Sequence, residues 1–160
     1  MATVELLLAQ LGTVVIPAIT VQFAVREKLV VGNSPVKIGW FGEDLEAWFF
    51  GKIEEPTVEI TLRYAKLTMA SRDGPIMAEL GENKETILAQ IYALMEHQPN
   101  GEQGVLLTNR WANIFYVCDV NGDLRAVDVY WGVDGWYINA RSVAGPRGWG
   151  GMDRVFSRNS

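Results

Sequence analysis

The chain has 160 residues and a mass of 17.8 kDa; 49% of its residues are hydrophobic and 21% are charged. This composition is typical of one globular domain and excludes a disordered chain. The formal net charge of −5 argues against a nucleic-acid partner, because binding to phosphates requires a basic surface. The single cysteine excludes an internal disulfide, and with no Asn-x-Ser/Thr acceptor present it predicts a cytoplasmic protein.

Charge is unevenly distributed along the chain. Residues 43–102 hold five basic and twelve acidic side chains, a net charge of −7, whereas residues 1–42 and 103–160 each carry +1. Every basic residue after Lys84 is an arginine, a residue type suited to bidentate and stacked contacts. The arginine-containing end is compatible with an interface between complementary surfaces, and equally with ion pairs between its own strands.

The apolar stretch from Leu6 to Val25 resembles a signal peptide or membrane anchor in composition only. Glu5 stands where a signal peptide has a positive charge, and Gln10 and Gln22 would be costly in lipid. We therefore predict no membrane segment and a buried first strand. The alternation of apolar and polar residues from Ile19 to Arg26 predicts that this part is a half-buried strand.

The next elements are short. Asn33 to Pro35 predict a turn, and Val36 to Phe41 a strand. The segment from Glu43 to Phe50 has apolar residues at helical spacing and acidic residues in its first turn, so it predicts a short helix. A strand containing Val58 to Tyr64 follows, and Asp73 to Pro75 are expected to interrupt the chain.

The longest predicted helix runs from about Asn83 to His97. Asn83 is a favourable N-terminal cap, and an apolar stripe that includes Ile87, Ile91 and Leu94 has helical spacing. We expect this helix to be the main one and to pack on the sheet.

The last third of the chain predicts a three-stranded meander. The strands are expected at Ile114–Val120, Leu124–Trp131 and Trp136–Val143, joined by Asn121-Gly122 and Asp134-Gly135, which are favoured in two-residue hairpin turns. The fold class is therefore α+β: an antiparallel sheet with this C-terminal meander and two helices, in a single domain of residues 1–160.

Two-residue turns would also fix the strand pairing. Tyr116 would pair with Val127, and Asp128 with Arg141. One face of the meander would then be nearly apolar and pack on the main helix: Tyr116, Cys118, Val120, Val127, Val129, Trp131, Ile138 and Ala140.

The opposite face of the meander is the candidate binding site. It would collect Asp128, Tyr130, Tyr137, Asn139 and Arg141, and aromatic residues and arginine are enriched at binding surfaces. The alternative is a solvated face with one cross-strand ion pair. The glycine-rich loop nearby carries Trp149, which is expected either to be tucked in as a plug or to be displayed for a partner.

Few residues have a catalytic pattern. His97 is the only histidine, which excludes a metal site with several imidazoles. Cys118 is expected to be a small buried residue rather than a nucleophile. The segment from Asp119 to Asp123 lacks the glycine and glutamate of a calcium loop and predicts a hairpin turn, and Gly145–Gly151 lacks a phosphate-binding motif. We therefore predict no catalytic residue, no metal site and no cofactor.

Near the C-terminus, Val155 and Phe156 are expected to add an edge strand, to dock the end of the chain, or to act as a recognition peptide. Four segments resemble a family of small bacterial proteins without an assigned activity: LRYAKL from Leu62, ETILAQIYALME from Glu85, ANIFYVCDVNGDLRAV from Ala112 and RVFSRNS from Arg154. The resemblance implies a bacterial, self-standing domain and transfers no site residue.

Two functional hypotheses follow. The first is a non-enzymatic interaction or self-assembly module that binds a protein partner or a second copy of the chain; the aromatic content and the opposed charge zones favour it. The second is a small-ligand-binding protein or small hydrolase with its site on the outer face of the meander.

Overall fold

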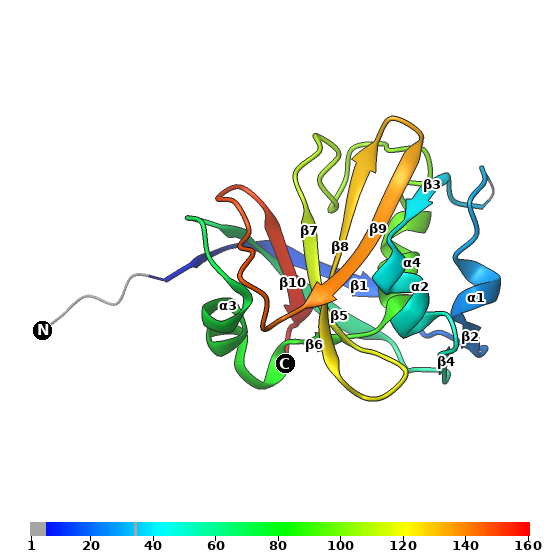
Figure 1. Cartoon of the computed structure of the whole chain (residues 1–160), viewed down its shortest axis with the longest axis horizontal. Helices are drawn as coiled ribbons and strands as arrows, with labels where there is room; N and C mark the ends of the chain where they lie inside the picture. The colour runs from blue at the N-terminus through cyan, green and yellow to red at the C-terminus, as the bar shows by residue number, and fades with distance from the viewer. Residues whose placement is uncertain (1–5, 34) are drawn as a thin grey trace, which may run out of the picture.

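One mixed β-sheet organises the computed structural model of the chain, which describes residues 6–33 and 35–160 (Figure 1). The expectations that rest on Glu5 and on a turn through Ser34 fall outside these residues. Eight strands form the sheet: β1 Leu8–Ile16, β3 Ile38–Phe41, β5 Ile60–Leu67, β6 Glu85–Thr86, β7 Asn113–Cys118, β8 Leu124–Gly132, β9 Gly135–Ser142 and β10 Arg154–Arg158. A separate ribbon pairs β2 (Phe23–Ala24) with β4 (Ile53–Glu54).

The strands of the sheet lie in the order β1-β5-β10-β7-β8-β9-β3, with β6 paired to β7. The fold is thus mixed α and β with a large, mostly antiparallel sheet. The expectation of a purely antiparallel sheet is wrong, because β10 and β6 pair with β7 in parallel, and β3 pairs with β9 in parallel. These parallel pairs join segments that are distant in sequence, so no hairpin turn forces them to be antiparallel.

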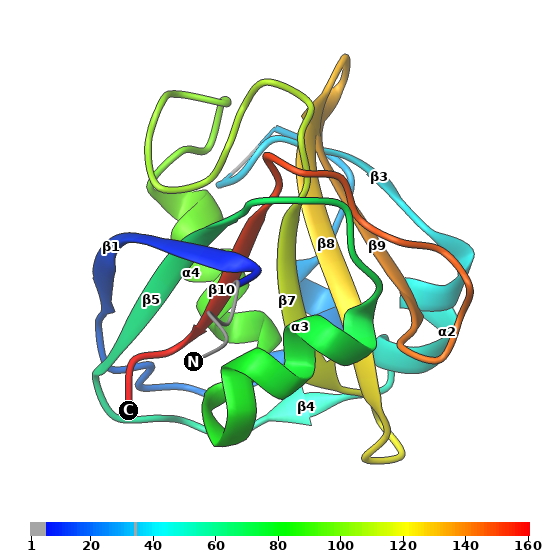
Figure 2. The same ribbon diagram turned by 90° about the vertical axis from the view of Figure 1, so that its left-hand side faces the viewer.

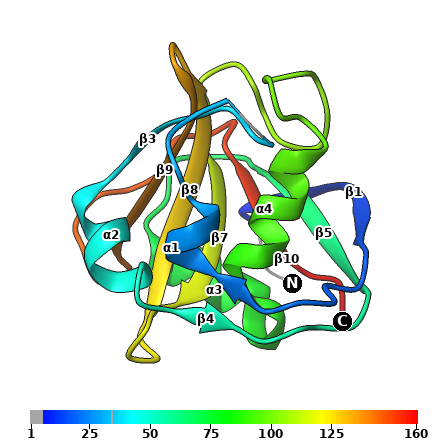
Figure 3. The same cartoon turned by 90° about the vertical axis from the view of Figure 1, so that its right-hand side faces the viewer.

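Helices cover both faces of the sheet. α3 (Asp73–Leu80) lies on one face, and α4 (Leu88–Glu96), α1 (Val25–Lys28) and α2 (Glu43–Phe49) lie on the other (Figures 2 and 3). Each face has its own buried cluster: Ile76 and Leu80 belong to the one under α3, and Ile91 and Met95 to the one under α4. In the described ranges, no helix combines the length and the apolar character needed to cross a membrane.

The main helix begins later than the sequence predicts. α4 starts at Leu88, because residues 81–83 form a 3₁₀ turn and residues 85–86 form β6. The expected cap at Asn83 is therefore wrong. Instead the buried carboxylate of Glu54, in β4, accepts hydrogen bonds from the backbone N–H groups of Leu88 (2.9 Å) and Ala89 (2.7 Å). The carboxylate thus satisfies the positive end of the helix. The Lys52 ammonium lies 3.3 Å from the carboxylate and keeps its buried charge paired.

The first third of the chain also differs from the expectation. The segment expected to be a strand from Ile19 to Arg26 contains only the two residues of β2 before α1 begins. The first strand of the sheet is β1, which is an edge strand with mostly exposed residues rather than a buried one. A bulge at Leu11 changes the side of the sheet that β1 faces, so that Leu8 packs in the cluster under α3 and Ile16 in the cluster under α4.

Two short elements agree with the sequence, and one was missed. β3 and α2 confirm the strand expected at 36–41 and the short helix expected at 43–50. The residues expected to interrupt the chain, Asp73 to Pro75, instead form the first turn of α3. Proline is tolerated there because the first turn of a helix does not use its N–H groups internally.

The three strands of the meander are confirmed, but both pairings are wrong. Cys118 pairs with Leu124, because Asp119 accepts hydrogen bonds from the N–H groups of Asn121 and Asp123 and makes a longer loop. This one-residue shift turns β7 over, so Phe115 and Val117 face α4, and Tyr116 faces α3. In the second hairpin Gly132 pairs with Gly135, a shift of two residues that leaves the faces unchanged.

β10 is a central strand rather than an edge. It pairs with β5 on one side and with β7 on the other, and Val155 and Phe156 are buried. The Phe156 ring stacks between Phe115, at a centroid distance of 4.6 Å, and Tyr64, at 5.7 Å.

Removing the charge of Glu54 should destabilise the fold. We expect Glu54→Gln to lower the free energy of unfolding by about 1–3 kcal/mol, because a buried helix terminus loses a charged acceptor and Lys52 loses its partner. Urea denaturation measures the change. Glu55→Gln is the matched control, since the neighbouring carboxylate is exposed and bonds only the exposed Gln22 side chain. Equal stability of the two variants would contradict the role given to Glu54.

Candidate functional site

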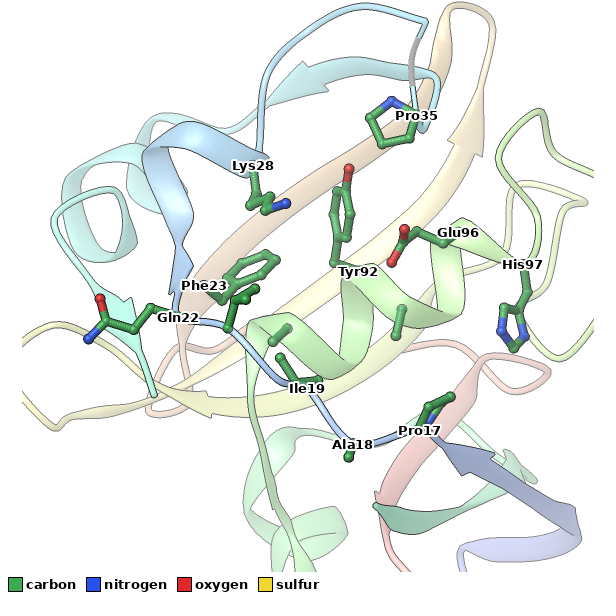
Figure 4. A pocket seen from close by; sticks show the side chains of 13 residues that line it. Pro17, Ala18, Ile19, Gln22, Phe23, Lys28, Pro35, Tyr92, Glu96 and His97 are labelled. Atoms are coloured by element: carbon green, nitrogen blue, oxygen red, sulfur yellow. The ribbon is translucent and has the colours of Figure 1, made fainter. Parts of the chain in front are cut away.

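A pocket of about 410 Å³ lies between α4 and the segment that follows β1 (Figure 4). Two alanines of α4, Ala89 and Ala93, are four residues apart and therefore lie on the same side of the helix, where their short side chains leave space. The opposite wall is formed by the segment 17–23. Two backbone hydrogen bonds between Ile19 and Thr57 (2.8 and 3.0 Å) attach this segment to the residues that precede β5.

The pocket has an apolar floor and a charged rim. Tyr92 and Phe23 are buried, with their ring centroids 5.6 Å apart, and Ile19 lines the same apolar surface. Lys28, from α1, and Glu96, the last residue of α4, are exposed and extend toward Tyr92 from its two sides (Figure 4). This combination is typical of pockets for small molecules, in which apolar contacts give affinity and a few polar groups fix the orientation.

The surroundings of the Tyr92 hydroxyl favour its neutral form. Burial raises the pKa of Tyr92, and the negative charge of Glu96 raises it further. A neutral phenol both donates and accepts hydrogen bonds, so Tyr92 offers the pocket a polar group in an otherwise apolar wall. His97 lines the end of the pocket near Pro17 (Figure 4).

The six residues of the sequence-predicted site lie on the other face of the sheet. Trp149 is buried, which selects the plug over the displayed side chain: its indole N–H donates to Asp73 Oδ1 at 2.7 Å. The guanidinium group of Arg141 stacks on the Trp149 ring at 3.5 Å and donates to the carbonyl of Gly148 at 3.2 Å. These contacts hold the glycine-rich loop over the outer face of the meander.

The expected pairing of Asp128 with Arg141 is wrong. Asp128 lies opposite Asn139, and Arg141 opposite Ala126, because of the two-residue shift in the second hairpin. Tyr130, Tyr137 and Asn139 are half-buried beside Asp128, and the two tyrosine rings contact each other at 5.2 Å.

Buried acids surround Arg141. Asp73 accepts a hydrogen bond from the Tyr116 hydroxyl at 2.7 Å, and Asp153 accepts from the N–H groups of Ala112 and Gly150. Burial raises the pKa of Asp128 to about 7; Arg141 opposes this shift, whereas Asp153 and Asp73 add to it. Burial likewise raises the pKa of Asp153. Arg141, Asp73 and Asp153 thus bind neighbouring groups and the loop that covers this face.

Cys118 is half-buried and its thiol donates to Glu85 at 3.4 Å. Burial raises the pKa of Cys118, and the charge of Glu85 raises it further, which disfavours the thiolate that a nucleophile requires. Across residues 6–33 and 35–160, no cluster of three or more His, Cys, Asp or Glu side chains is placed to hold a metal ion.

Sequence reasoning missed the pocket, although one of its walls has a signal. Ala89, Ala93 and Glu96 lie on one side of a predicted helix, where two small residues interrupt the apolar surface. Nothing in the sequence indicates that residues 17–28 face them, because that contact depends on the pairing of Ile19 with Thr57. Comparison of the chain with family models, with curated proteins and with solved structures finds no match.

Asp128 should make stability depend on pH. Its folded-state pKa is above the ordinary value, so the folded protein binds the extra proton, and stability is lost as pH rises from about 4 through about 7. The full effect corresponds to about 4 kcal/mol. Asp128→Asn should therefore gain stability relative to the natural chain between pH 4 and pH 8, measured by urea denaturation at each pH.

The control for the loss of one charge is Asp134→Asn, which removes an exposed carboxylate from the turn between β8 and β9. If the natural chain and Asp128→Asn differ in free energy of unfolding by the same amount at pH 4 and pH 8, the burial of an ionisable Asp128 is contradicted.

Proposed function

We propose that the protein binds a small organic molecule in the pocket between α4 and residues 17–23. The observation that carries the proposal is a volume of about 410 Å³ with an apolar floor and free charged groups at its rim. Ligand pockets are commonly about 300–1,000 Å³. The bacterial family resemblance gives no activity, so the geometry of this pocket is the basis of the proposal.

Binding is favoured over hydrolysis by the side chains that line the pocket. Its described lining contains no serine, threonine or cysteine, and Cys118 lies in β7, outside it. Its two charged or ionisable side chains from the end of α4, Glu96 and His97, are both exposed. We therefore place the protein among binding proteins rather than enzymes.

Filling the pocket should abolish ligand binding without unfolding the chain. We expect small molecules from a metabolite collection to raise the thermal midpoint of the natural protein, and Ala93→Leu to lose these shifts because the added side chain occupies the pocket. Differential scanning fluorimetry measures both. The control is Ala78→Leu, at an exposed position of α3 on the opposite face. Compounds that stabilise Ala93→Leu as much as the natural chain would overturn the proposal.

A second function, self-association, is favoured by the open edge of β1. This nine-residue strand contains no charged residue, and in the sheet that the structure describes only its β5 side is paired. Edge strands usually carry charges or proline that prevent pairing with another chain; β1 has the bulge at Leu11 alone. Leu11 and Val15 are about half exposed. Antiparallel pairing of β1 with β1 of a second copy would satisfy its free backbone groups.

A charge on β1 should prevent this association. We expect the natural chain to form a dimer at high concentration and Val15→Lys to remain a monomer, because a lysine on an edge strand disfavours its pairing with another chain. Light scattering after size-exclusion chromatography measures the mass at each concentration. Val58→Lys, a highly exposed position outside the sheet, is the control. A natural chain that is monomeric at every concentration would exclude self-association.

A further inference from the structure

We infer that the ligand of the α4 pocket is a free α-amino acid with an apolar side chain. This inference rests on the proposed function and specifies the chemistry of its ligand. The evidence is the combination of one cation, one anion, a neutral hydroxyl and an apolar floor around a single pocket.

The two charges of the rim are not used by the fold. The ion pairs of the described residues are Lys52 with Glu54, and Arg125 with Asp119 and Asp123. Lys28 and Glu96 take part in none of these, although both line the pocket and approach Tyr92 from opposite sides (Figure 4). They come from different elements, α1 and α4, so their presence at one pocket is a product of the tertiary fold.

Opposite, separated charges select a ligand that carries both signs. A carboxylate can be bound by the Lys28 ammonium, and an ammonium group by the Glu96 carboxylate, each as a charge-assisted hydrogen bond. A ligand with only one charge would leave the other charge of the rim without a partner. The neutral Tyr92 hydroxyl supplies a further donor between them (Figure 4).

The remainder of the pocket is suited to an apolar side chain. Ile19, Phe23, Ala89 and Ala93 give it an apolar surface with no charged group. A volume of about 410 Å³ is near the lower end of ligand pockets, which favours one amino acid over a peptide or a nucleotide.

Isothermal titration calorimetry at pH 7 and low salt tests the inference with defined probes. L-leucine, L-methionine and L-phenylalanine are titrated first, followed by two compounds that keep the phenyl group but lack one charge, 3-phenylpropionate and 2-phenylethylamine. We expect at least one amino acid to bind, and L-phenylalanine, if it is bound, to bind about tenfold more tightly than either analogue.

Two variants assign the charges. Lys28→Met should weaken the binding of amino acids and of 3-phenylpropionate by about tenfold and leave the binding of 2-phenylethylamine unchanged. Glu96→Gln should weaken the binding of 2-phenylethylamine by about tenfold and leave that of 3-phenylpropionate unchanged. Arg26→Met and Glu27→Gln are matched controls, because both residues are exposed on α1 and neither lines the pocket. The four positions are exposed, so the variants are expected to fold, which circular dichroism verifies.

The outcomes separate the inference from the proposed function. If no amino acid binds, or if binding is insensitive to Lys28→Met and Glu96→Gln, the amino-acid assignment is wrong. Compounds of the metabolite collection that bind the natural chain but not Ala93→Leu would in that case still support a ligand pocket. If neither these probes nor the metabolite collection gives a signal that depends on Ala93, the proposed function fails as well.

Discussion

The position of α4 depends on one buried carboxylate. Glu54 reaches from β4 to the first two N–H groups of the helix, and Lys52, two residues earlier, compensates its charge. A short helix has little stability of its own and needs its end groups satisfied by the rest of the protein. Since α4 forms one wall of the pocket and covers the larger buried cluster, Glu54 anchors the N-terminal end of a helix that borders both of them.

Local features of the fold were predictable from sequence, and those that depend on distant partners were not. α2 and the three strands of the meander follow from periodicity and turn residues within about ten positions. The start of α4 could not be found in this way, because its cap is 34 residues away. The error in the first hairpin has a similar cause: one side chain, Asp119, bonds two N–H groups of its own loop and Arg125, and so favours a longer turn than Asn121-Gly122 suggests.

The candidate sites show why chemically conspicuous residues can mislead. Arg141 and Trp149 attract attention in the sequence, and the structure uses them, together with Asp73, to hold a loop against the sheet. The pocket on the other face arises where side chains are small, at Ala89 and Ala93, and small residues carry no chemical signature. Sequence patterns identify residues that make contacts, whereas a cavity is a place where contacts are missing.

The central place of β10 has a consequence for cooperativity. Among the strands that the structure describes, β1 and β5 are hydrogen-bonded to the rest of the sheet only through this five-residue strand. The two parts are therefore hydrogen-bonded into one sheet only while β10 is in place, and its release would expose a new edge on each part. A segment of five residues thus provides the hydrogen-bonded connection between the strands at the two ends of the sheet.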